Sequence, residues 1–313
     1  LFEEEEYVIN VGPQHPATHG VLRFRVSLEG EIIKKLDVHC GYIHRGIEKM
    51  CEELTYPQTL ALTDRLDYLG ASQNRHALCM CIEKGLGVEV PERVQYIRTI
   101  MDELQRIDSH LLFFACLCMD MGALTAFFYG FRDREKVLDI LEQTTGGRLI
   151  QTYNTIGGVQ ADIHPDFVRK VKEFIAYMRP ALREYHEIFT GNVIAQERLK
   201  GTGVLTREDA VSFGATGGTG RAAGWACDVR KRHPYAMYGK VDFEEVLFTE
   251  GDCLARYMVR MKEIEQSMNI IGQLIDNIPE GEYQLKMKPV IRIPEGSYYA
   301  AVEGSRGEFG VFI

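Results

Sequence analysis

The sequence predicts a mainly α-helical protein with β structure at both ends, the α+β fold class. Three observations indicate this: apolar and polar residues alternate near the N-terminus, apolar residues recur at helical spacing from about Thr55 to Ile275, and extended segments return after Gly281. We therefore expect an N-terminal β region at 1–45, a helical body at 46–280 and a C-terminal extended segment at 281–313.

The N-terminal region has the period of two that is typical of a half-buried strand. Leu22, Phe24, Val26 and Leu28 alternate with polar residues, and Glu29-Gly30 supplies a turn into a second extended segment over 32–38. An isolated hairpin is only marginally stable, so we expect this hairpin or small sheet to pack against something larger.

The body contains several helix signals in order. Pro91 suits a first helical turn, Asp133 can cap a helix over 134–145 that Gly146 ends, and Pro165 can start a helix that Pro180 kinks or divides. The longest clean helical pattern runs over 254–275. The Gly-rich stretch 201–251 is expected to be irregular, and short strands are expected over 298–302 and 309–313.

The stretch Leu111–Phe131 is nearly all apolar and is long enough to span a bilayer. Asp120 lies near its centre, where a charge would cost roughly 2.5–3.5 kcal/mol on insertion scales. Gly122 and Gly130 also interrupt it. We therefore expect a buried helix pair or a bend rather than a transmembrane helix. A buried Asp120 must be paired or protonated, which makes it a candidate site residue.

Composition excludes some classes of protein. The chain has 45% hydrophobic and 26% charged residues, which is the balance of a soluble globular protein, and its net charge of −9 argues against a general nucleic-acid binder. The acidic start is not a secretory leader. None of the eight cysteines forms a Cys-x-x-Cys pair, so we expect buried free thiols in a reducing compartment.

Two features could carry chemistry but are ambiguous by themselves. The loop Gly12–Gly20 contains His15 and His19 four residues apart, and its prolines forbid an ordinary helix. The two imidazoles could hydrogen-bond in a structural turn, bind a metal, or present a proton donor to a cleft. Tyr68 could be a half-buried packing residue, or its phenol could hydrogen-bond a carbonyl oxygen and pass it a proton.

A series of motifs resembles the D subunit of NADH:quinone oxidoreductase, respiratory complex I. They keep the order of that family from about residue 9 to the end of the chain, which makes coincidence very improbable. The motifs are Gly12–Gly20, His39–Lys49, Asp64–Tyr68, Met119–Thr125, Phe127–Tyr129, Gly157–Val159, Asp228–Lys231, His233–Tyr235, Gly251-Asp252 and Arg306–Gly310. The acidic start could be the remnant of a linker from a fused C subunit.

The resemblance implies the fold of the nickel–iron hydrogenase large subunit without its metal. That ancestor would hold nickel through two Cys-x-x-Cys pairs, whereas Asp67 and Gly70 stand at the positions of the first pair, flanking Tyr68. A carboxylate and a glycine cannot replace thiolates as nickel ligands, so no metal is expected. A hydrogenase-type large subunit of a related membrane complex is the alternative, and stoichiometric nickel would favour it.

The resemblance also implies that the former metal pocket binds the head of a quinone. His19 and Tyr68 match the residues that hydrogen-bond the quinone carbonyls and donate protons, and Asp120 matches the carboxylate that pairs with the histidine. Proton loss to the reduced quinone would leave a charge imbalance, which is expected to help drive proton translocation in the membrane arm. The further candidates for the quinone pocket are His15, Thr18, Gly20 and Asp67.

Three departures from the family pattern matter. Ile150 stands where the family usually has a histidine close to the terminal iron–sulfur cluster, which favours a low-potential acceptor such as menaquinone, while Arg45 remains as a cationic neighbour of that cluster. Thr155 stands where the family normally has an arginine. A helical stretch that we expect in the family is missing between Pro289 and Ile293.

The expected setting is a multi-subunit complex. The chain by itself is expected to hold no cofactor and to be inactive, because its electrons come from an iron–sulfur cluster on a partner, the B subunit. The C subunit, possibly fused, and the membrane-embedded H subunit are the other expected partners, on the cytoplasmic side of a bacterial inner membrane and without a transmembrane helix in this chain. A divergent scaffold subunit that no longer handles quinone is the non-enzymatic alternative.

Overall fold

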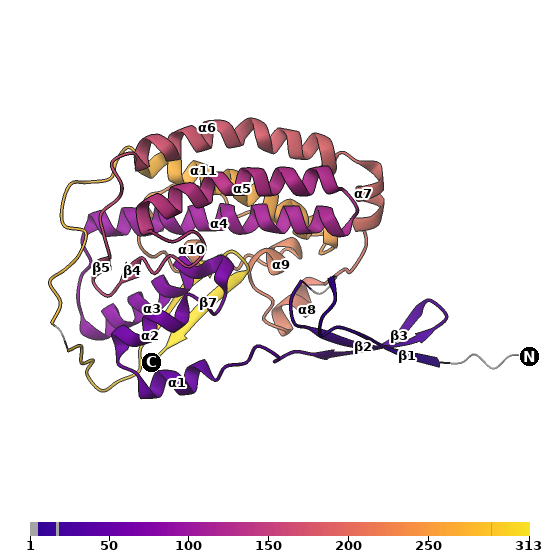
Figure 1. The fold of residues 1–313 in the computed structure, drawn as a ribbon, viewed down its shortest axis with the longest axis horizontal. Helices are drawn as coiled ribbons and strands as arrows, with labels where there is room; N and C mark the ends of the chain where they lie inside the picture. Colours follow the sequence, from indigo (N-terminus) through magenta and orange to yellow (C-terminus); the bar gives the residue numbers. More distant parts are fainter. Residues whose placement is uncertain (1–5, 17–18, 289) are drawn as a thin grey trace, which may run out of the picture. The chain divides into compact units, whose positions relative to one another are not determined.

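The computed structural model describes residues 6–16, 19–288 and 290–313. The chain forms two compact units, Leu1–Leu54 and Thr55–Ile313. About half of it is helical, with strands near both ends, which confirms the predicted α+β class (Figure 1).

The first unit is built on a three-stranded antiparallel sheet. Strand β2 (Arg23–Glu29) lies between β1 (Glu6–Val11) and β3 (Ile32–His39), and a two-residue connection at Gly30 joins β2 to β3. This confirms the predicted hairpin and adds β1 to it. Val26 is buried in the middle of β2 opposite Ile9, and helix α1 (Ile47–Glu53) follows the sheet.

Four long helices of the second unit lie side by side as a bundle (Figure 1). Helix α4 packs against α5 and α11, and α6 packs against α5 and α11 on the other side. Phe114 of α4 stacks on Tyr185 of α6 with ring centroids 4.2 Å apart. The four helices are α4 (Glu92–Asp120), α5 (Leu124–Thr145), α6 (Phe167–Tyr185) and α11 (Cys253–Leu274).

The start of α4 after Pro91 and the whole of α11 match the predicted helices. So does the end of α5, where Gly146 takes the left-handed conformation at φ 80° that suits glycine after a helix. The apolar stretch 111–131 is a helix pair joined at 121–123, as predicted, but the expected full burial is wrong, because Leu124 and Phe128 are exposed. Gly130 lets α5 approach α4, because a Cβ there would lie 2.8 Å from that of Ala115.

The expected burial of Asp120 is wrong for this chain. It is the last residue of α4 and is exposed, because the helix reaches the surface of the unit before the chain turns back. Across the described part of the chain, no helix is long and apolar enough to cross a membrane.

The predicted capping role of Asp133 is also wrong. Helix α5 begins at Leu124, so Asp133 lies within it and is fully buried. Its carboxylate accepts hydrogen bonds from the hydroxyls of Tyr177 (2.6 Å) and Tyr185 (2.5 Å), both on α6. Asp133 therefore links two helices, and tertiary partners override its local preference for a helix start.

Pro180 does not divide its helix. Helix α6 runs through it to Tyr185 and continues into a π-helical turn, η3 (His186–Thr190). Pro180 and Ala176, whose carbonyl loses its helical partner, are both exposed. Water can satisfy that carbonyl, so the helix tolerates the proline on this face.

Shorter elements surround the bundle. The stretch 201–251, expected to be irregular, contains three helices of four to six residues and a 3-10 turn, too short to leave a periodic signal. The elements within 201–251 are α8 (Arg207–Ser212), α9 (Gly217–Ala222), α10 (Val229–Arg232) and η4 (Tyr238–Lys240). The other helices and turns outside the bundle are α2 (Tyr56–Thr63), η2 (Tyr68–Gly70), α3 (Ala71–Leu86) and α7 (Val193–Leu199).

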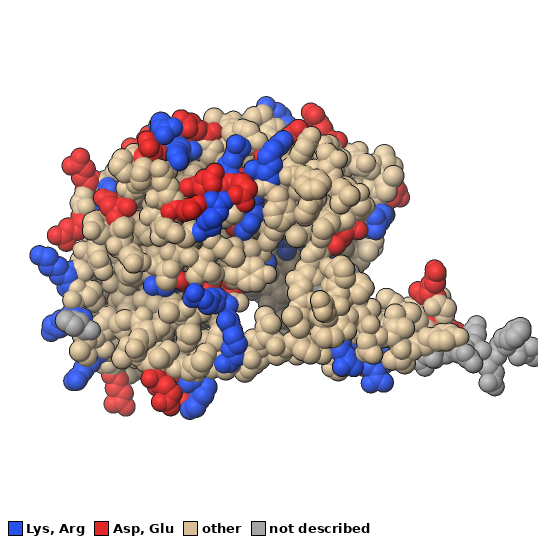
Figure 2. Space-filling view, in the orientation of Figure 1, with Lys and Arg blue, Asp and Glu red and all other residues tan. Residues whose placement is uncertain are grey.

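The C-terminal strands form an antiparallel hairpin, as predicted. Strand β6 (Tyr299–Gly304) pairs with β7 (Gly307–Phe312) and packs on α3. A second pair of two-residue strands, β4 (Asn154–Thr155) and β5 (Gly158–Val159), also lies near α3 and α4. Charged side chains gather over α5 and α6 on the face shown in Figure 2. Among the surface ion pairs of the second unit, Arg132 pairs with Glu184 and Arg148 with Asp139.

Candidate functional site

Tyr68 lies at the start of a short 3-10 turn that leads into α3. Asp67 caps this turn, since its Oδ1 accepts a hydrogen bond of 3.1 Å from the backbone N–H of Leu69. Its backbone carbonyl accepts one of 2.9 Å from the amide of Asn74 on α3. Leu69 and Gly70 are buried, whereas Tyr68 is 51% exposed. The turn is thus fixed while its phenol remains accessible.

The C-terminal hairpin holds the same turn from a distant part of the sequence. Arg306, between β6 and β7, donates a 2.6 Å hydrogen bond to Oδ1 of Asp67. Its neighbour Ser305 is buried, donates its backbone N–H to Gln73 (3.2 Å) and lies 2.8 Å from the hydroxyl of Ser109 on α4. Arg306 belongs to the motif Arg306–Gly310, but nothing in the sequence predicts its contact with Asp67.

A layer of buried ionisable groups lies behind the turn. Nη1 of Arg75 lies 3.0 Å from Oδ2 of Asp64, and burial raises the pKa of that carboxyl although the guanidinium opposes it. His76 Nδ1 lies 2.6 Å from Oδ2 of Asp102, which also accepts a 2.8 Å bond from Ser72 through Oδ1. These pairs tie α2, α3 and α4 together beneath Tyr68.

Deeper in the helical body is a second set of buried charges, here called the core ionic cluster. It joins α4 to α9, α10, α11 and β6. Arg221 donates 2.6 Å to Glu303, and Arg230 donates 3.1 Å to Glu103 and 2.6 Å to Asp228. The members are Glu103, Arg106, Arg221, Asp228, Arg230, Glu263 and Glu303, all buried. Each charge meets an opposite one, so the cluster is a structural link between helices.

The predicted site residues fall in both units. His15, His19, Gly20 and Arg45 lie in the first unit and are exposed, and Thr18 lies outside the described residues. His19 has φ 49°, a left-handed conformation that is uncommon for a residue other than glycine. His19 belongs to the first unit, and Tyr68 and Asp120 belong to the second. That His19 contacts either of them stays a prediction.

Within the second unit, the structure brings Asp67 and Tyr68 together on one turn. The turn meets α4 at Gln105, whose side-chain amide lies 3.2 Å from the carbonyl of Leu69. Asp120 lies about four helical turns further along α4, roughly 20 Å at the rise of an α-helix. Ile150 is partly buried in the loop between α5 and β4.

The positions of Asp67 and Gly70 are close in space. A Cβ on Gly70 would lie 3.5 Å from Oδ2 of Asp67, because both residues belong to the same tight turn. The carboxylate of Asp67 is engaged by Leu69 and Arg306. Among the residues that the structure describes, no three His, Cys, Asp or Glu side chains are grouped as metal ligands.

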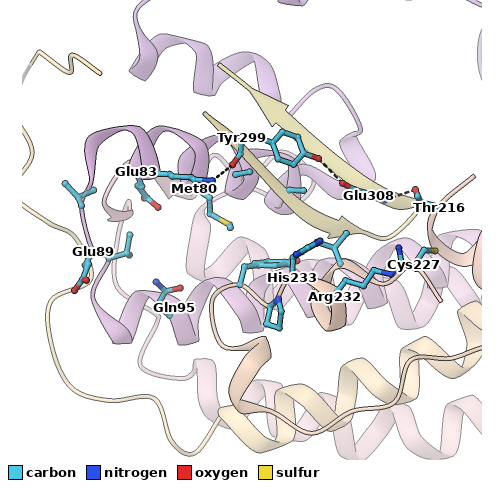
Figure 3. A pocket seen from close by; sticks show the side chains of 18 of the residues that line it. Met80, Glu83, Glu89, Gln95, Thr216, Cys227, Arg232, His233, Tyr299 and Glu308 are labelled. Carbon is cyan, nitrogen blue, oxygen red and sulfur yellow. Dashed lines mark hydrogen bonds between the residues drawn. The ribbon is translucent and has the colours of Figure 1, made fainter. Parts of the chain in front are cut away.

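A groove of about 930 Å³ opens elsewhere on the second unit, between α3, the C-terminal hairpin and the loops around α10 (Figure 3). Lys84 donates to the carbonyl of Tyr299, and the hydroxyl of Tyr299 donates to Glu308, along one wall. None of the predicted quinone-site residues that the structure describes lines it. The groove is therefore separate from the Tyr68 turn.

The comparison with known proteins decides the family. Residues 120–292 match the family described as the 49 Kd subunit of respiratory-chain NADH dehydrogenase. The chain is 44% identical over 314 residues to the D subunit of NADH-quinone oxidoreductase from Geobacillus kaustophilus, covering all of this chain and 86% of that protein. The chain belongs to this 49 kDa family.

Fused members of the 49 kDa family are more similar still. The chain is 86% identical over 313 residues to the C/D subunit of NADH-quinone oxidoreductase from Phocaeicola vulgatus and 79% identical to that of Bacteroides thetaiotaomicron. It covers 60% and 59% of these two proteins, so it spans less than two thirds of their length. The expectation that it is the D part of a fused C/D subunit fits these relatives.

The fold agrees with the family. A subunit of the membrane-bound sulfane sulfur reductase, an archaeal respiratory membrane complex, is 34% identical with a TM-score of 0.95, covering 100% of this chain and 86% of that one. The predicted fold class is confirmed.

The predicted loss of a helical stretch between Pro289 and Ile293 does not distinguish this chain from two of its relatives. The alignments with the D subunits of Geobacillus kaustophilus and Bacillus cereus each extend over 314 residues for the 313 of this chain. These proteins therefore carry no long extra segment between the positions of Pro289 and Ile293. The helical stretch that we expected at this place is therefore absent from these two relatives as well.

Proposed function

We propose that this chain forms one wall of the quinone-head pocket in a NADH:quinone oxidoreductase complex of the complex I type. The observation that carries the proposal is the Tyr68 turn, in which a half-exposed phenol stands on a backbone fixed by Asp67, Asn74 and Arg306. A fixed backbone under an accessible hydrogen-bond donor is what a site needs to orient a substrate carbonyl. Membership of the 49 kDa family supports it.

The proposed chemistry uses two proton donors on this chain. Tyr68 hydrogen-bonds one quinone carbonyl and His19 the other, and each passes a proton as two electrons arrive, so that quinone becomes quinol. Asp120 pairs with the His19 imidazolium, and the charge left unbalanced by proton loss is coupled to proton translocation. His15, Thr18, Gly20 and Asp67 complete the quinone pocket in this proposal.

The electrons come from a terminal iron–sulfur cluster that a partner subunit holds. Arg45 and Ile150 are proposed to lie near it. Ile150 is apolar and cannot exchange a proton with solvent, so the cluster potential would vary little with pH. That property, together with a low potential, suits menaquinone as the acceptor.

The proposed assembly places this chain in the peripheral arm. Its neighbours are the iron–sulfur B subunit, a C subunit fused to this chain as in the C/D relatives, and the membrane-embedded H subunit, on the cytoplasmic side of a bacterial membrane. The chain alone has no electron donor, so quinone reduction requires the whole complex.

Replacing Tyr68 by Phe in the intact complex tests the proposal. Loss of the hydroxyl should lower NADH-driven reduction of a short-chain quinone by roughly 100-fold, because a positioned general acid contributes on the order of 10²–10⁴ in rate. Tyr299→Phe is the matched control. Tyr299 is 48% exposed and also hydrogen-bonded, but it lies on β6 at the separate groove.

Assembly is checked by the subunit content of the purified complex, and electron input by NADH oxidation with an artificial acceptor upstream of the cluster. Both should match the parent in Tyr68→Phe. Unchanged quinone turnover in an assembled Tyr68→Phe complex would overturn the proposed role and favour a scaffold subunit.

A further inference from the structure

Gln105 of α4 connects the Tyr68 turn to the interior of the helical body. Its side-chain N–H groups donate to the backbone carbonyl of Leu69 (3.2 Å) and to Oδ2 of Asp108 (3.1 Å). Its Oε1 accepts a 2.6 Å hydrogen bond from Gln151. The side chains of Gln105, Asp108 and Gln151 are all buried. Every polar atom of the Gln105 amide is therefore used, and its orientation is determined by its partners.

Asp108 is an unusual residue for its position. It is fully buried one turn along α4 from Gln105, and its counter-ion is Arg134 of α5, whose Nε lies 3.0 Å from Oδ1 and whose Nη2 donates to Oδ2 at 3.3 Å. The Nε approach lacks hydrogen-bond geometry, so the pair is imperfect. Replacing a buried ion pair with apolar residues is often neutral or stabilising, so fold stability alone does not explain a carboxylate here.

We propose that Gln105 and Asp108 are positioning residues for Tyr68. The carboxylate of Asp108 orients the Gln105 amide, and that amide holds the carbonyl of Leu69 and with it the backbone that carries the phenol. This inference rests on the proposed function of Tyr68. It adds a restraint from α4 to those that Asn74 on α3 and Arg306 on the hairpin apply through Asp67.

The restraint depends on the charge of Asp108. An ionised carboxylate only accepts, and it accepts strongly from Gln105 and Arg134, whereas a protonated one is a weaker acceptor and can donate. Burial raises the pKa of Asp108 to about 6; Arg134 and Gln105 oppose this, and the charge of Glu135 adds to it. Among the described residues, the charged groups that act most strongly on Asp108 are Arg134 and Glu135, both on α5. The turn should be well held above pH 6 and loosened below it.

The test uses the intact complex and a short-chain quinone, with kcat and KM measured from about pH 5.5 to about pH 8. Asp108→Asn keeps the shape and removes the charge, and Gln105→Met keeps the length and removes the amide. Asp133→Asn is the matched control, a buried carboxylate on α5 that bonds to Tyr177 and Tyr185 instead of the turn.

We expect the parent kcat/KM to fall below about pH 6 and the Asp108→Asn profile to lose that limb. At pH 7.5 both test variants should lose about tenfold in kcat/KM, because small misplacements of a reacting group are costly. The double variant should lose little more than either single one, since the two residues act as one unit. Asp133→Asn should keep the parent profile.

The inference would be overturned if Asp108→Asn kept both the kcat/KM of the parent and its fall below about pH 6. It would also be overturned if Gln105→Met had the same kcat/KM as the parent. If Tyr68→Phe abolishes turnover in the same preparation, the proposed function of Tyr68 stands although the inference about Gln105 and Asp108 fails. If Tyr68→Phe has no effect, the proposed function itself fails.

Discussion

Glu103 shows how a single residue joins distant parts of the chain. Its carboxylate accepts hydrogen bonds from Arg230 (3.1 Å), Tyr238 (2.6 Å) and Ser267 (2.6 Å), and it pairs with Arg106 one turn along α4. Burial disfavours its ionisation, but the two guanidinium groups outweigh burial and lower the pKa of Glu103 to about 2. The charged form of Glu103 thus stabilises the folded state.

The pH dependence of this stabilisation follows from the direction of the shift. A carboxyl whose pKa is lower in the folded state stabilises that state fully at pH values above its unfolded pKa near 4.5. This stabilisation is lost as the pH falls toward 2. A shift of this size corresponds to roughly 3 kcal/mol. Glu103→Gln should therefore lower the free energy of unfolding by about 3 kcal/mol at pH 7, because Arg106 and Arg230 stay buried with less countercharge.

Urea unfolding of the whole chain at pH 7 and near pH 3 measures this, with Glu92→Gln as the control. Glu92 is on the same helix but is exposed and pairs with Lys240 at the surface, so its loss should change stability by less than about 0.5 kcal/mol. A Glu103→Gln chain as stable as the parent at pH 7 would contradict the assigned role of the cluster.

At the scale of elements, helix α6 contains a proline in its interior, where proline is unfavourable. Pro180 lies on its exposed face, where it removes one backbone hydrogen bond from the helix. Proline in a helix interior is about 3 kcal/mol less favourable than alanine, partly offset by its stiffening of the unfolded chain, worth about 0.4–1 kcal/mol.

We therefore expect Pro180→Ala to raise the free energy of unfolding by about 1–2 kcal/mol, seen as a higher urea midpoint. Pro165→Ala is the comparison, because Pro165 precedes α6 in a turn where a proline fits. That variant should be neutral or slightly less stable. A lower midpoint in Pro180→Ala would mean that the proline supports the transition into the π-helical turn at His186.

The Tyr68 turn is the element that depends most on long-range contacts. Its N-terminal cap is local, through Asp67, but its restraints come from α3, α4 and the hairpin turn at Ser305-Arg306. Isolated 3-10 turns are short and weak, so this one is stable because other elements hold it. A site built this way can keep a half-exposed side chain in a defined place.

At the scale of the molecule, the two units differ sharply in how much they bury. Among the described residues of the first unit, Val26 is the one buried apolar side chain, and Ile32, Ile33 and Val38 of β3 are more than half exposed. The second unit contains the large core of the helical bundle. A small sheet with so little burial cannot offset the conformational entropy of folding by itself.

A fragment of residues 55–313 should therefore fold alone, with a helical circular-dichroism spectrum and a cooperative thermal transition. A fragment of residues 1–54 should show neither strand signal nor a transition. Cooperative unfolding of the shorter fragment would show that its sheet is stable without the rest of the protein or a partner subunit.

The sequence by itself determined the elements whose signals are local. The period of two at 22–28, the long helical pattern of 254–275, the stop at Gly146 and the break in the apolar stretch near Gly122 all follow from residue spacing and backbone preference. The family was also readable from the order of its motifs, and the resemblance implied Tyr68 as a residue that hydrogen-bonds the quinone.

Only the tertiary structure decided what is buried and what is bonded. Asp133 looked like a helix cap and is a buried link to α6, whereas Asp120 looked buried and is exposed at the end of α4. Nothing in the sequence near Tyr68 indicates that Arg306, Gln105 and Asp108 restrain its turn. Burial and hydrogen bonding depend on which distant segments meet, and local periodicity contains no information on that meeting.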